Sequence, residues 1–250
     1  MQITTKFTDK VILITGASDG IGKATAIECA KNGATVIIHG KTLPKLEALY
    51  DEIVAAGYTE PVIYPLDYEK MTPEDCDTLN KTIHNEFGRL DGLFNNAGWL
   101  GASSPIQQYD LKLWHRVIQI NLNATFMLTQ ACIPLLNNED YSSIVFTLDD
   151  KNTAYWGAYG VAKAGLQSFM QILADELENS KINVVGLDPG KVRTNFRTRA
   201  FPAENPETHA TPDNVAKVAA FLLSENSKNI NNAASHGKIY KLDDLLSITE

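Results

Sequence analysis

The amino-acid sequence predicts one α/β domain, a doubly wound parallel sheet of about seven strands with helices on both faces. Two observations predict this fold class. Short runs rich in Val and Ile alternate along the chain with longer helix-like stretches, and strands covered on both faces read as continuous apolar runs. In addition, no internal repeat or linker divides the 250 residues, so a single domain, residues 1–250, accounts for the whole chain.

Seven apolar runs, bounded by Gly, Asp or Pro, mark the expected strands. They lie at residues 11–15, 35–40, 61–67, 90–98, 142–148 and 182–190, with a weaker run at 237–242. Their alternation with helical segments is typical of a parallel sheet with crossover connections.

Helix-like stretches separate the runs, and the first three end before a glycine, a common helix stop. These stretches are 21–32, 44–56 and 73–87, followed by two longer ones at about 114–136 and 157–179. Residues 195–214 carry three prolines and no strong periodicity. Loops of that length are commonly lids, and we expect this one to cover a substrate.

The composition favours a cytoplasmic globular protein. A net charge of -8 argues against a nucleic-acid-binding surface and against binding to anionic membranes. Cys29, Cys76 and Cys132 are odd in number and are not spaced as metal ligands, so we expect free thiols in a reducing compartment and no metal. Neither a signal-peptide core nor a membrane span is expected.

A glycine-rich turn, TGASDGIG at residues 15–22, joins the first expected strand to the first helix. Glycines let the backbone turn tightly and approach a pyrophosphate, and the helix N-terminus supplies unpaired N–H groups. In Rossmann-type sheets, ligands bind at the carboxyl ends of the strands, where this turn must lie. The turn therefore predicts a dinucleotide site.

Five motifs together make the chain resemble the short-chain dehydrogenase/reductase family. They are TGASDGIG at 15–22, NNAG at 95–98, INLNATF at 120–126, YGVAK at 159–163 and DPGKVRT at 188–194. Their order and separations fit that family from about Lys6 to Ser224, and the stretches WGAY and NATFMLTQ are similar to a bacterial branch of uncharacterised oxidoreductases. Beyond Ser224, ASHGKIYKLDDLL replaces the usual glycine-rich strand end.

The resemblance implies an oxidoreductase and gives a role to each matching position. The residues implied to bind the dinucleotide are Gly16, Ser18, Asp19, Gly20, Ile21, Gly22, Gly40, Lys41, Asp67, Asn96, Ala97, Gly98, Tyr159, Lys163, Pro189, Gly190, Val192 and Thr194. In the family the glycine turn cradles the phosphates, and residues 189–194 position the nicotinamide ring. The expected catalytic residues are Tyr159, Lys163, Asn121 and Asp149, among which Asn121 would hold a water of a proton relay.

Tyr159 and Lys163 stand four residues apart, on one face of the expected helix. The resemblance implies that Tyr159 exchanges a proton with a carbonyl or an alcohol. A free tyrosine has a pKa near ~10, and a lysine cation nearby is expected to lower that pKa toward the useful range. The chemistry of the pair thus supports proton transfer independently of the resemblance.

The serine that usually accompanies this tyrosine is missing. In the family its hydroxyl lies just past the fifth strand and orients the substrate carbonyl. Thr147 keeps a hydroxyl but lies within the expected strand, whereas Asp149 falls in the place of the serine when the strand is aligned by its apolar run. An ionised Asp149 would repel alkoxide charge and raise the pKa of Tyr159.

NADP(H) is expected in preference to NAD(H), because the second expected strand ends in Gly40 and Lys41. An acidic residue there would accept the ribose hydroxyls and repel a 2′-phosphate. Gly40 leaves room instead, and Lys41 supplies a cation. Asp19, in the place of a frequently basic residue, weakens this preference.

Two hypotheses from different classes remain. The first is an NADP(H)-dependent oxidoreductase that interconverts a carbonyl and an alcohol on a small-molecule substrate. The second is a catalytically impaired nucleotide-binding protein of the same fold that acts as a sensor or partner subunit. In both, the two long helices are expected to pair with a symmetry mate and give a homodimer or homotetramer, as they do in the family.

Overall fold

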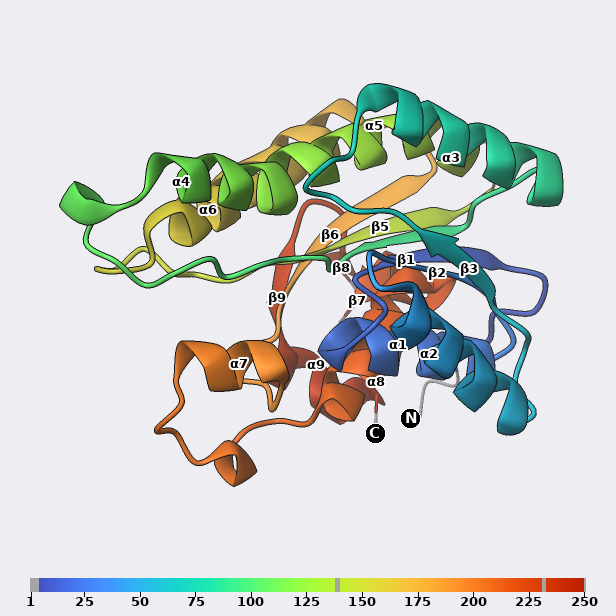
Figure 1. Ribbon diagram of the computed structural model, residues 1–250. Coiled ribbons are helices and arrows are strands. Elements are labelled where there is room, and N and C mark those ends of the chain that lie inside the picture. The colour runs from blue at the N-terminus through green and yellow to red at the C-terminus, as the bar shows by residue number, and fades with distance from the viewer. Residues whose placement is uncertain (1–4, 138–139, 231–232, 250) are drawn as a thin grey trace.

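The computed structural model describes residues 5–137, 140–230 and 233–249, in which a central sheet lies between two layers of helices (Figure 1). The strands are in the order β3-β2-β1-β4-β5-β6-β9, and every neighbouring pair is parallel. Their bounds are β1 (Val11–Thr15), β2 (Thr35–Gly40), β3 (Val62–Pro65), β4 (Gly92–Asn95), β5 (Ser142–Thr147), β6 (Ile182–Asp188) and β9 (Ile239–Lys241). The predicted fold class is confirmed.

The apolar runs form strands because the helices cover both faces of the sheet. Every residue of β1, β4 and β5 is buried, whereas the edge strand β3 exposes Val62 and Pro65. Several strands are shorter than the runs that predict them. The run residues beyond β3 and β4, 66–67 and 96–98, form turns at the carboxyl edge of the sheet.

Two sets of helices cover the sheet. One face carries α1 (Gly20–Lys31), α2 (Leu43–Ala55), α8 (Pro212–Leu223) and α9 (Leu242–Thr249), and the other carries α3 (Pro73–Phe87), α4 (Leu111–Ile118), α5 (Ala124–Leu136) and α6 (Gly157–Glu176) (Figure 1). Each face has its own apolar core. Ile12 and Ile14 of β1 enter one core and Val11 and Leu13 the other, because successive side chains of a strand point to opposite faces.

The three predicted helix stops are present. Gly33, Gly57 and Gly88 have φ angles of 97°, 71° and 68°, in the left-handed region that glycine adopts without strain. Helices α1, α2 and α3 end within one residue of the predicted positions.

The predicted single helix at about 114–136 is interrupted. A π-helical turn, η2 (Gln119–Asn123), separates α4 from α5, and turns of this kind are frequent at functional sites. The apolar periodicity is helical throughout this region, so the sequence pattern does not indicate the wider turn. It contains Asn121.

Residues 195–214 are more regular than the sequence predicts. They contain α7 (Asn195–Ala200) and the short η3 (Pro206–Thr208), and α8 begins at Pro212, so a lid can extend only over 195–211. The start of α8 is fixed by a capping box between Thr211 and Asn214. The prediction of a long irregular loop was therefore wrong at its C-terminal end.

The last part of the chain adds an antiparallel pair, β7 (Asn229–Ile230) and β8 (Ala233–Ala234), before the edge strand β9 and helix α9. Only β9 is predicted by the sequence pattern. Short turns η1 (Ile106–Gln108) and η4 (Glu225–Lys228) complete the described elements. Within the described ranges, no helix has both the length and the apolar character needed to cross a membrane.

The strand order places the expected dinucleotide site. The chain winds outward from β1 to β2 and β3, then returns to the other side of β1 with β4. A crevice for ligands opens at the carboxyl ends of the two strands where the winding reverses. Residues 15–22 follow β1 there, and residues 96–98 follow β4.

Candidate active site

The glycine turn is packed too closely for side chains. Gly16 and Gly20 have φ angles of 67° and 53°, which favour glycine. A Cβ atom on Gly22 would lie 2.3 Å from the carbonyl oxygen of Gly16, and one on Gly16 would lie 2.9 Å from Cα of Ala97. The absence of side chains lets the turn fold tightly against residues 96–97, and the N–H groups at the start of α1 fit the phosphates of a dinucleotide.

Thr15 ties the glycine turn to the turn after β4, and sequence analysis did not single it out. Its buried hydroxyl accepts hydrogen bonds from the backbone N–H groups of Asn96 and Ala97, at 2.9 and 3.0 Å. The side-chain amide of Asn96 donates to the Thr15 carbonyl at 3.1 Å. Asn96, Ala97 and Gly98 are therefore brought beside Gly16, as the resemblance implies.

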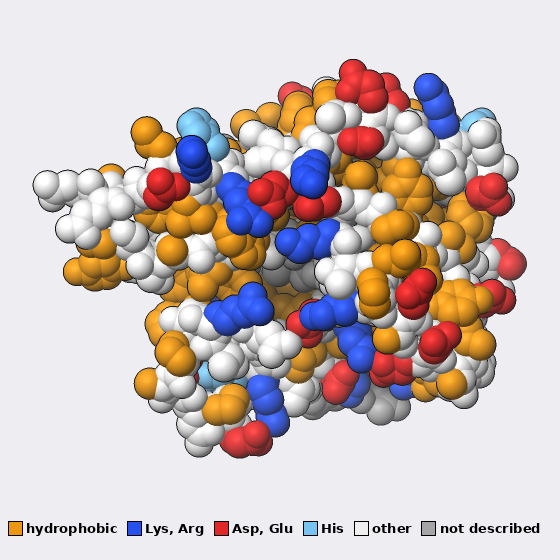
Figure 2. Space-filling view, viewed as in Figure 1, with side chains coloured by type: hydrophobic (Ala, Val, Ile, Leu, Met, Phe, Trp, Pro, Cys, Tyr) orange, Lys and Arg blue, Asp and Glu red, His pale blue; other side chains and the backbone are white. Residues whose placement is uncertain are grey.

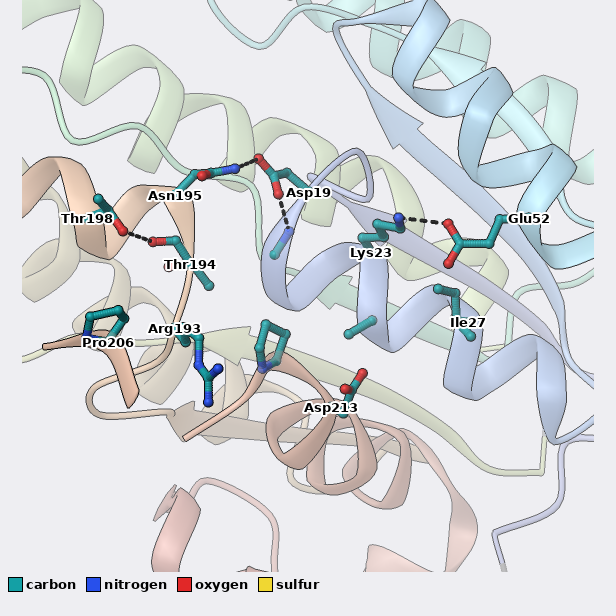
Figure 3. A pocket seen from close by; sticks show the side chains of 13 residues that line it. Asp19, Lys23, Ile27, Glu52, Arg193, Thr194, Asn195, Thr198, Pro206 and Asp213 are labelled. Carbon is teal, nitrogen blue, oxygen red and sulfur yellow. Dashed lines mark hydrogen bonds and ion pairs between the residues drawn. The ribbon is translucent and has the colours of Figure 1, made fainter. Parts of the chain in front are cut away.

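Asp19 joins the glycine turn to the lid segment. Its carboxylate accepts from the backbone N–H of Gly20 and from the side-chain amide of Asn195, both at 2.8 Å, and Figure 3 shows the second contact spanning from α1 to α7. Thr194, the N-cap of α7, lies opposite Gly20 across a narrow gap: a Cβ on Gly20 would be 3.1 Å from its methyl group.

A cleft of about 490 Å³ lies between the start of α1, the segment 193–198 and the start of α8 (Figure 3). It is lined by Asp19, Gly20 and Thr194, but not by Tyr159 or Lys163. The cleft thus lies beside the start of α1 and is separate from the reactive end of the site. Figure 2 shows Lys and Arg side chains around a hollow in the middle of this face of the molecule.

Gly40 ends β2 beside the glycine turn, and Lys41 follows it. A Cβ on Gly40 would lie 3.5 Å from the hydroxyl of Ser18, and Lys41 is exposed. Lys41 forms no ion pair within the described part of the chain, so its ammonium group can meet an anion. Asp67 lies in the turn after β3, where its carboxylate accepts from the backbone N–H of Glu69 at 3.0 Å.

The segment after β6 faces the glycine turn. Asp188 accepts from the backbone N–H of Gly190 at 3.0 Å, and Gly190 has a φ angle of 62°. Pro189 and Val192 are buried, and Val192 forms a backbone bridge with Ala210. This bridge closes the lid segment at its base.

Tyr159 is in direct contact with Asp149. The Tyr159 hydroxyl donates to one carboxylate oxygen of Asp149 at 3.0 Å, and the Lys151 ammonium group binds the other at 2.5 Å. The hydroxyl of Thr147 instead lies 3.4 Å from the side-chain oxygen of Asn96. Of the two candidates for the place of the serine, the structure therefore brings Asp149, and not Thr147, to the tyrosine.

Lys163 comes from the next turn of α6 and is buried. Its ammonium group donates to the backbone carbonyl of Thr147 at 2.8 Å and lies 5.9 Å from the centre of the Tyr159 ring. The Thr147 carbonyl, at the end of β5, thus fixes the Lys163 ammonium group beside the Tyr159 ring. Burial lowers the pKa of Lys163 to about 8, although the charge of Asp149 acts in the opposite direction.

The expected lowering of the Tyr159 pKa by Lys163 is wrong for this structure. Burial, and then the charge of Asp149 and the hydrogen bond to it, raise the pKa of Tyr159 well above its ordinary value. The carboxylate favours the protonated phenol because a phenolate would place a second negative charge beside it. Tyr159 is thus held as a proton donor.

Asn121 lies in η2 and is almost fully buried. Its amide group donates to the backbone carbonyls of Trp99 and Val117, both at 2.8 Å, and its oxygen accepts from the Trp99 N–H at 2.9 Å. The side chain therefore positions the turn after β4. Its part in a proton relay stays a prediction.

An aromatic wall lies beside Tyr159, and sequence analysis did not single out two of its residues, Phe196 and Phe201. The rings of Trp156 and Phe196 lie 5.7 and 5.3 Å from that of Tyr159, and Phe201 lies 5.7 Å from Trp156. Lys151 was also missed, although it follows Asp149 by two residues. Phe196 and Phe201 come from the lid segment, so the lid contributes directly to the wall around Tyr159.

Comparisons with known proteins agree with this geometry. The family model for short chain dehydrogenase matches residues 10–205. An uncharacterised oxidoreductase of Escherichia coli, YciK, is 40% identical over 223 residues, 88% of each chain. Cyclohexanol dehydrogenase of an Acinetobacter strain is 32% identical over 236 residues, 90% of this chain and 92% of the relative.

A solved structure is similar over its full length. A short chain dehydrogenase from Shigella flexneri, complexed with NADP, has a TM-score of 0.90 at 37% identity, and the match covers 96% of this chain and 100% of that one. The family model spans more than half of the chain. The sequence motifs of the family lie at strand ends and turns, which the fold brings together in the site described above. The chain belongs to the short-chain dehydrogenase family.

Proposed function

We propose that this chain is an NADP(H)-dependent oxidoreductase that interconverts a carbonyl and an alcohol on a small molecule. The observation that carries the proposal is the stack of Tyr159 over Lys163 at the carboxyl edge of the sheet, in a chain of the short-chain dehydrogenase family. The relative named cyclohexanol dehydrogenase supports the substrate class.

The preference for NADP(H) is supported by two observations. Lys41 is exposed at the end of β2, beside Gly40, where the adenosine ribose of a dinucleotide lies in this fold. Similar solved structures are described as complexes with NADP and NADPH. Lys45 lies 3.8 Å from Asp19, and its positive charge offsets part of the repulsion between Asp19 and a phosphate.

The proton chemistry belongs to Tyr159 and its neighbours. When bound, NADPH supplies the hydride that reduces the substrate carbon. Tyr159 gives its proton to the substrate oxygen in reduction and takes it back in oxidation. Lys163 stabilises the negative charge that develops on the phenol oxygen, while Asp149 opposes its ionisation. We therefore expect slow turnover of simple ketones at neutral pH.

The proposal is tested by combining fluorescence titration of NADPH and NADH with a screen of aldehydes, ketones and alcohols. NADPH should bind more tightly than NADH. Tyr159→Phe should lower turnover by about 10² or more, with NADPH affinity unchanged, because the hydroxyl acts on the substrate. Turnover by Tyr159→Phe at the wild-type rate would contradict the proposal.

A catalytically impaired nucleotide-binding protein is the second candidate, and one observation favours it. The Tyr159 hydroxyl already donates a hydrogen bond to Asp149, so it must give up this hydrogen bond before it can donate to a substrate. This candidate predicts NADPH binding with no turnover of any substrate. The protein would then act as a sensor or as a partner subunit.

The working form is proposed to be a cytoplasmic homodimer or homotetramer. All three cysteines are free and buried, which suits a reducing compartment. An apolar groove between α5 and α6, lined by Leu122, Phe126, Met127 and Phe169, supports pairing with a second copy of the chain.

A further inference from the structure

Asp149 presents an acceptor where a substrate carbonyl would need a donor. One of its oxygens lies 3.0 Å from the Tyr159 hydroxyl, and the other is held by Lys151. The carboxylate of Asp149 is thus paired with a cation, and a carboxylate accepts hydrogen bonds but has no proton to donate. A substrate atom that contacts the Tyr159 hydroxyl therefore lies beside a carboxylate.

A second carboxylate acts on the same point. Asp188, at the end of β6, adds its negative charge to that of Asp149 at Tyr159. The buried ammonium group of Lys163 donates to the Thr147 carbonyl and lies 5.9 Å from the centre of the Tyr159 ring, whereas Asp149 contacts the hydroxyl itself. The surroundings of the Tyr159 hydroxyl thus favour a positively charged substrate atom.

The aromatic wall points to the same kind of substrate. Aromatic faces attract cations, and this wall already holds two: Lys151 lies 5.3 Å from the centre of the Trp156 ring, and Arg197 lies 3.8 Å from that of Phe201. Both cations have carboxylate partners of their own. A third cation placed against Tyr159 would share Asp149 with Lys151, by approaching the carboxylate oxygen that faces the Tyr159 hydroxyl.

We propose that this site reduces C=N bonds, and that Asp149 holds the substrate as a protonated imine, an iminium ion. The inference rests on the proposed NADPH-dependent reduction at Tyr159 and names the substrate class of that site. The iminium N–H donates to Asp149, and Tyr159 supplies the proton when the substrate arrives as a neutral imine. Asp149 thereby raises the protonated, more electrophilic fraction of the substrate.

For a substrate that arrives as the iminium ion, the reaction balances without a negatively charged intermediate; for a neutral imine, the proton that Tyr159 gives up is returned to it from water. The iminium carbon accepts a hydride, with its two electrons, from NADPH, and a C–H bond forms. The π electrons of the C=N bond become the lone pair of the nitrogen, so the products are an amine and NADP⁺. A ketone in the same place would develop negative charge on its oxygen beside Asp149, which opposes the reaction.

The test compares 3,4-dihydroisoquinoline, a cyclic imine, with 1-tetralone, a ketone of matched size, as substrates with NADPH. The wild type should reduce the imine with a kcat/KM at least about 10² higher than that for the ketone. Asp149→Asn should lower imine reduction at least tenfold, and Asp149→Ser should do so while raising ketone reduction. Asp150→Asn, which changes the exposed neighbouring carboxylate, should leave both rates unchanged.

A binding measurement provides a second readout. Calorimetry on the NADP⁺-loaded protein should show tetrahydroisoquinoline, a cation at neutral pH, binding about tenfold more tightly to the wild type than to Asp149→Asn, with equal NADP⁺ affinity in both. Faster reduction of the ketone, or an imine rate and amine affinity that Asp149→Asn leaves unchanged, would overturn the inference and leave the proposed function standing. NADPH binding without reduction of either substrate would overturn both.

Discussion

At the scale of the residue, the contact between Asp149 and Tyr159 decides the chemistry. A serine in that place would donate a hydrogen bond to the substrate and leave the tyrosine free to ionise. The carboxylate accepts from the tyrosine instead and keeps it protonated. Lys151 fixes the orientation of the carboxylate from the other side. The acid form of Tyr159 is thus stabilised at the expense of its basic form.

Alcohol oxidation should show this effect in its pH dependence, because Tyr159 must be ionised to accept the alcohol proton. Asp149→Asn removes a negative charge and lowers the pKa of Tyr159, so the rise of kcat/KM with pH should move to lower pH. Burial remains in the variant, and the pKa should stay above its ordinary value. The profile is measured with NADP⁺ and an alcohol of the screen. A profile identical to that of the wild type would contradict the assignment of Asp149.

Lys41 should determine the choice between the two dinucleotides. Lys41→Asp should weaken NADPH binding at least tenfold, or about 1.4 kcal/mol, because the carboxylate repels the 2′-phosphate, and should leave or improve NADH binding. Fluorescence titration measures both affinities. Lys112→Asp, an exposed position on α4, makes the same charge change elsewhere and should have no effect. Equal affinities of the wild type for NADPH and NADH would count against Lys41.

Much of the site could be predicted from the sequence, because its residues come from short motifs at strand ends. The alignment by the apolar run correctly placed Asp149 beside Tyr159. The expectation that Lys163 lowers the pKa of Tyr159 was wrong, because burial, which no local pattern shows, acts together with Asp149 to raise it. Phe196 was missed for the same reason: it reaches Tyr159 from a segment far along the chain.

At the scale of the element, strands and helix stops were predicted closely and the lid was not. Gly33, Gly57 and Gly88 end helices through their own backbone conformation, which is a local property. The lid is held by contacts that cluster on one carboxylate. The side chains of Arg197, Lys191 and His209 all contact the carboxylate of Glu204. The hydrogen bonds from Arg197 lower the pKa of Glu204 to about 2. These contacts make the lid a connected body.

Hydrogen exchange should show that the lid, residues 195–211, opens more readily than the sheet and slows when NADPH binds. Its link to the glycine turn is the hydrogen bond from Asn195 to Asp19, which lies next to the expected phosphate site. Exchange in α7 should be faster in Asn195→Ala, measured by mass spectrometry without ligand. Slow exchange that neither NADPH nor Asn195→Ala alters would rule out a moving lid.

At the scale of the whole molecule, the outer surface of α5 and α6, which does not pack on the sheet, carries exposed apolar side chains. Phe126, Val161 and Ile172 are each between 42% and 55% exposed, beside the groove lined by Phe169. Apolar residues gathered on two neighbouring helices commonly mark an interface. These exposed residues do not belong to the aromatic wall, which packs on Tyr159.

Light scattering at micromolar concentration should therefore show a dimer or tetramer. Ile172→Glu should shift the protein toward the monomer, because pairing would bury the new carboxylate in the interface. Since Ile172 is exposed in the monomer, the substitution should leave the fold of the monomer intact. Lys81→Glu, on the exposed side of α3, should not change the assembly. A wild-type monomer would contradict the proposed interface.

The most direct test of a working hydride-transfer site uses NADPH carrying two deuterium atoms at the nicotinamide C4, in a single turnover with a carbonyl or imine substrate. Mass spectrometry should find one deuterium on the former double-bond carbon of the product from the wild type, formed at least about 10² more slowly by Tyr159→Phe at equal NADPH affinity. Tight binding of NADPH with no deuterium in any product would contradict the account and leave a protein that only binds the nucleotide.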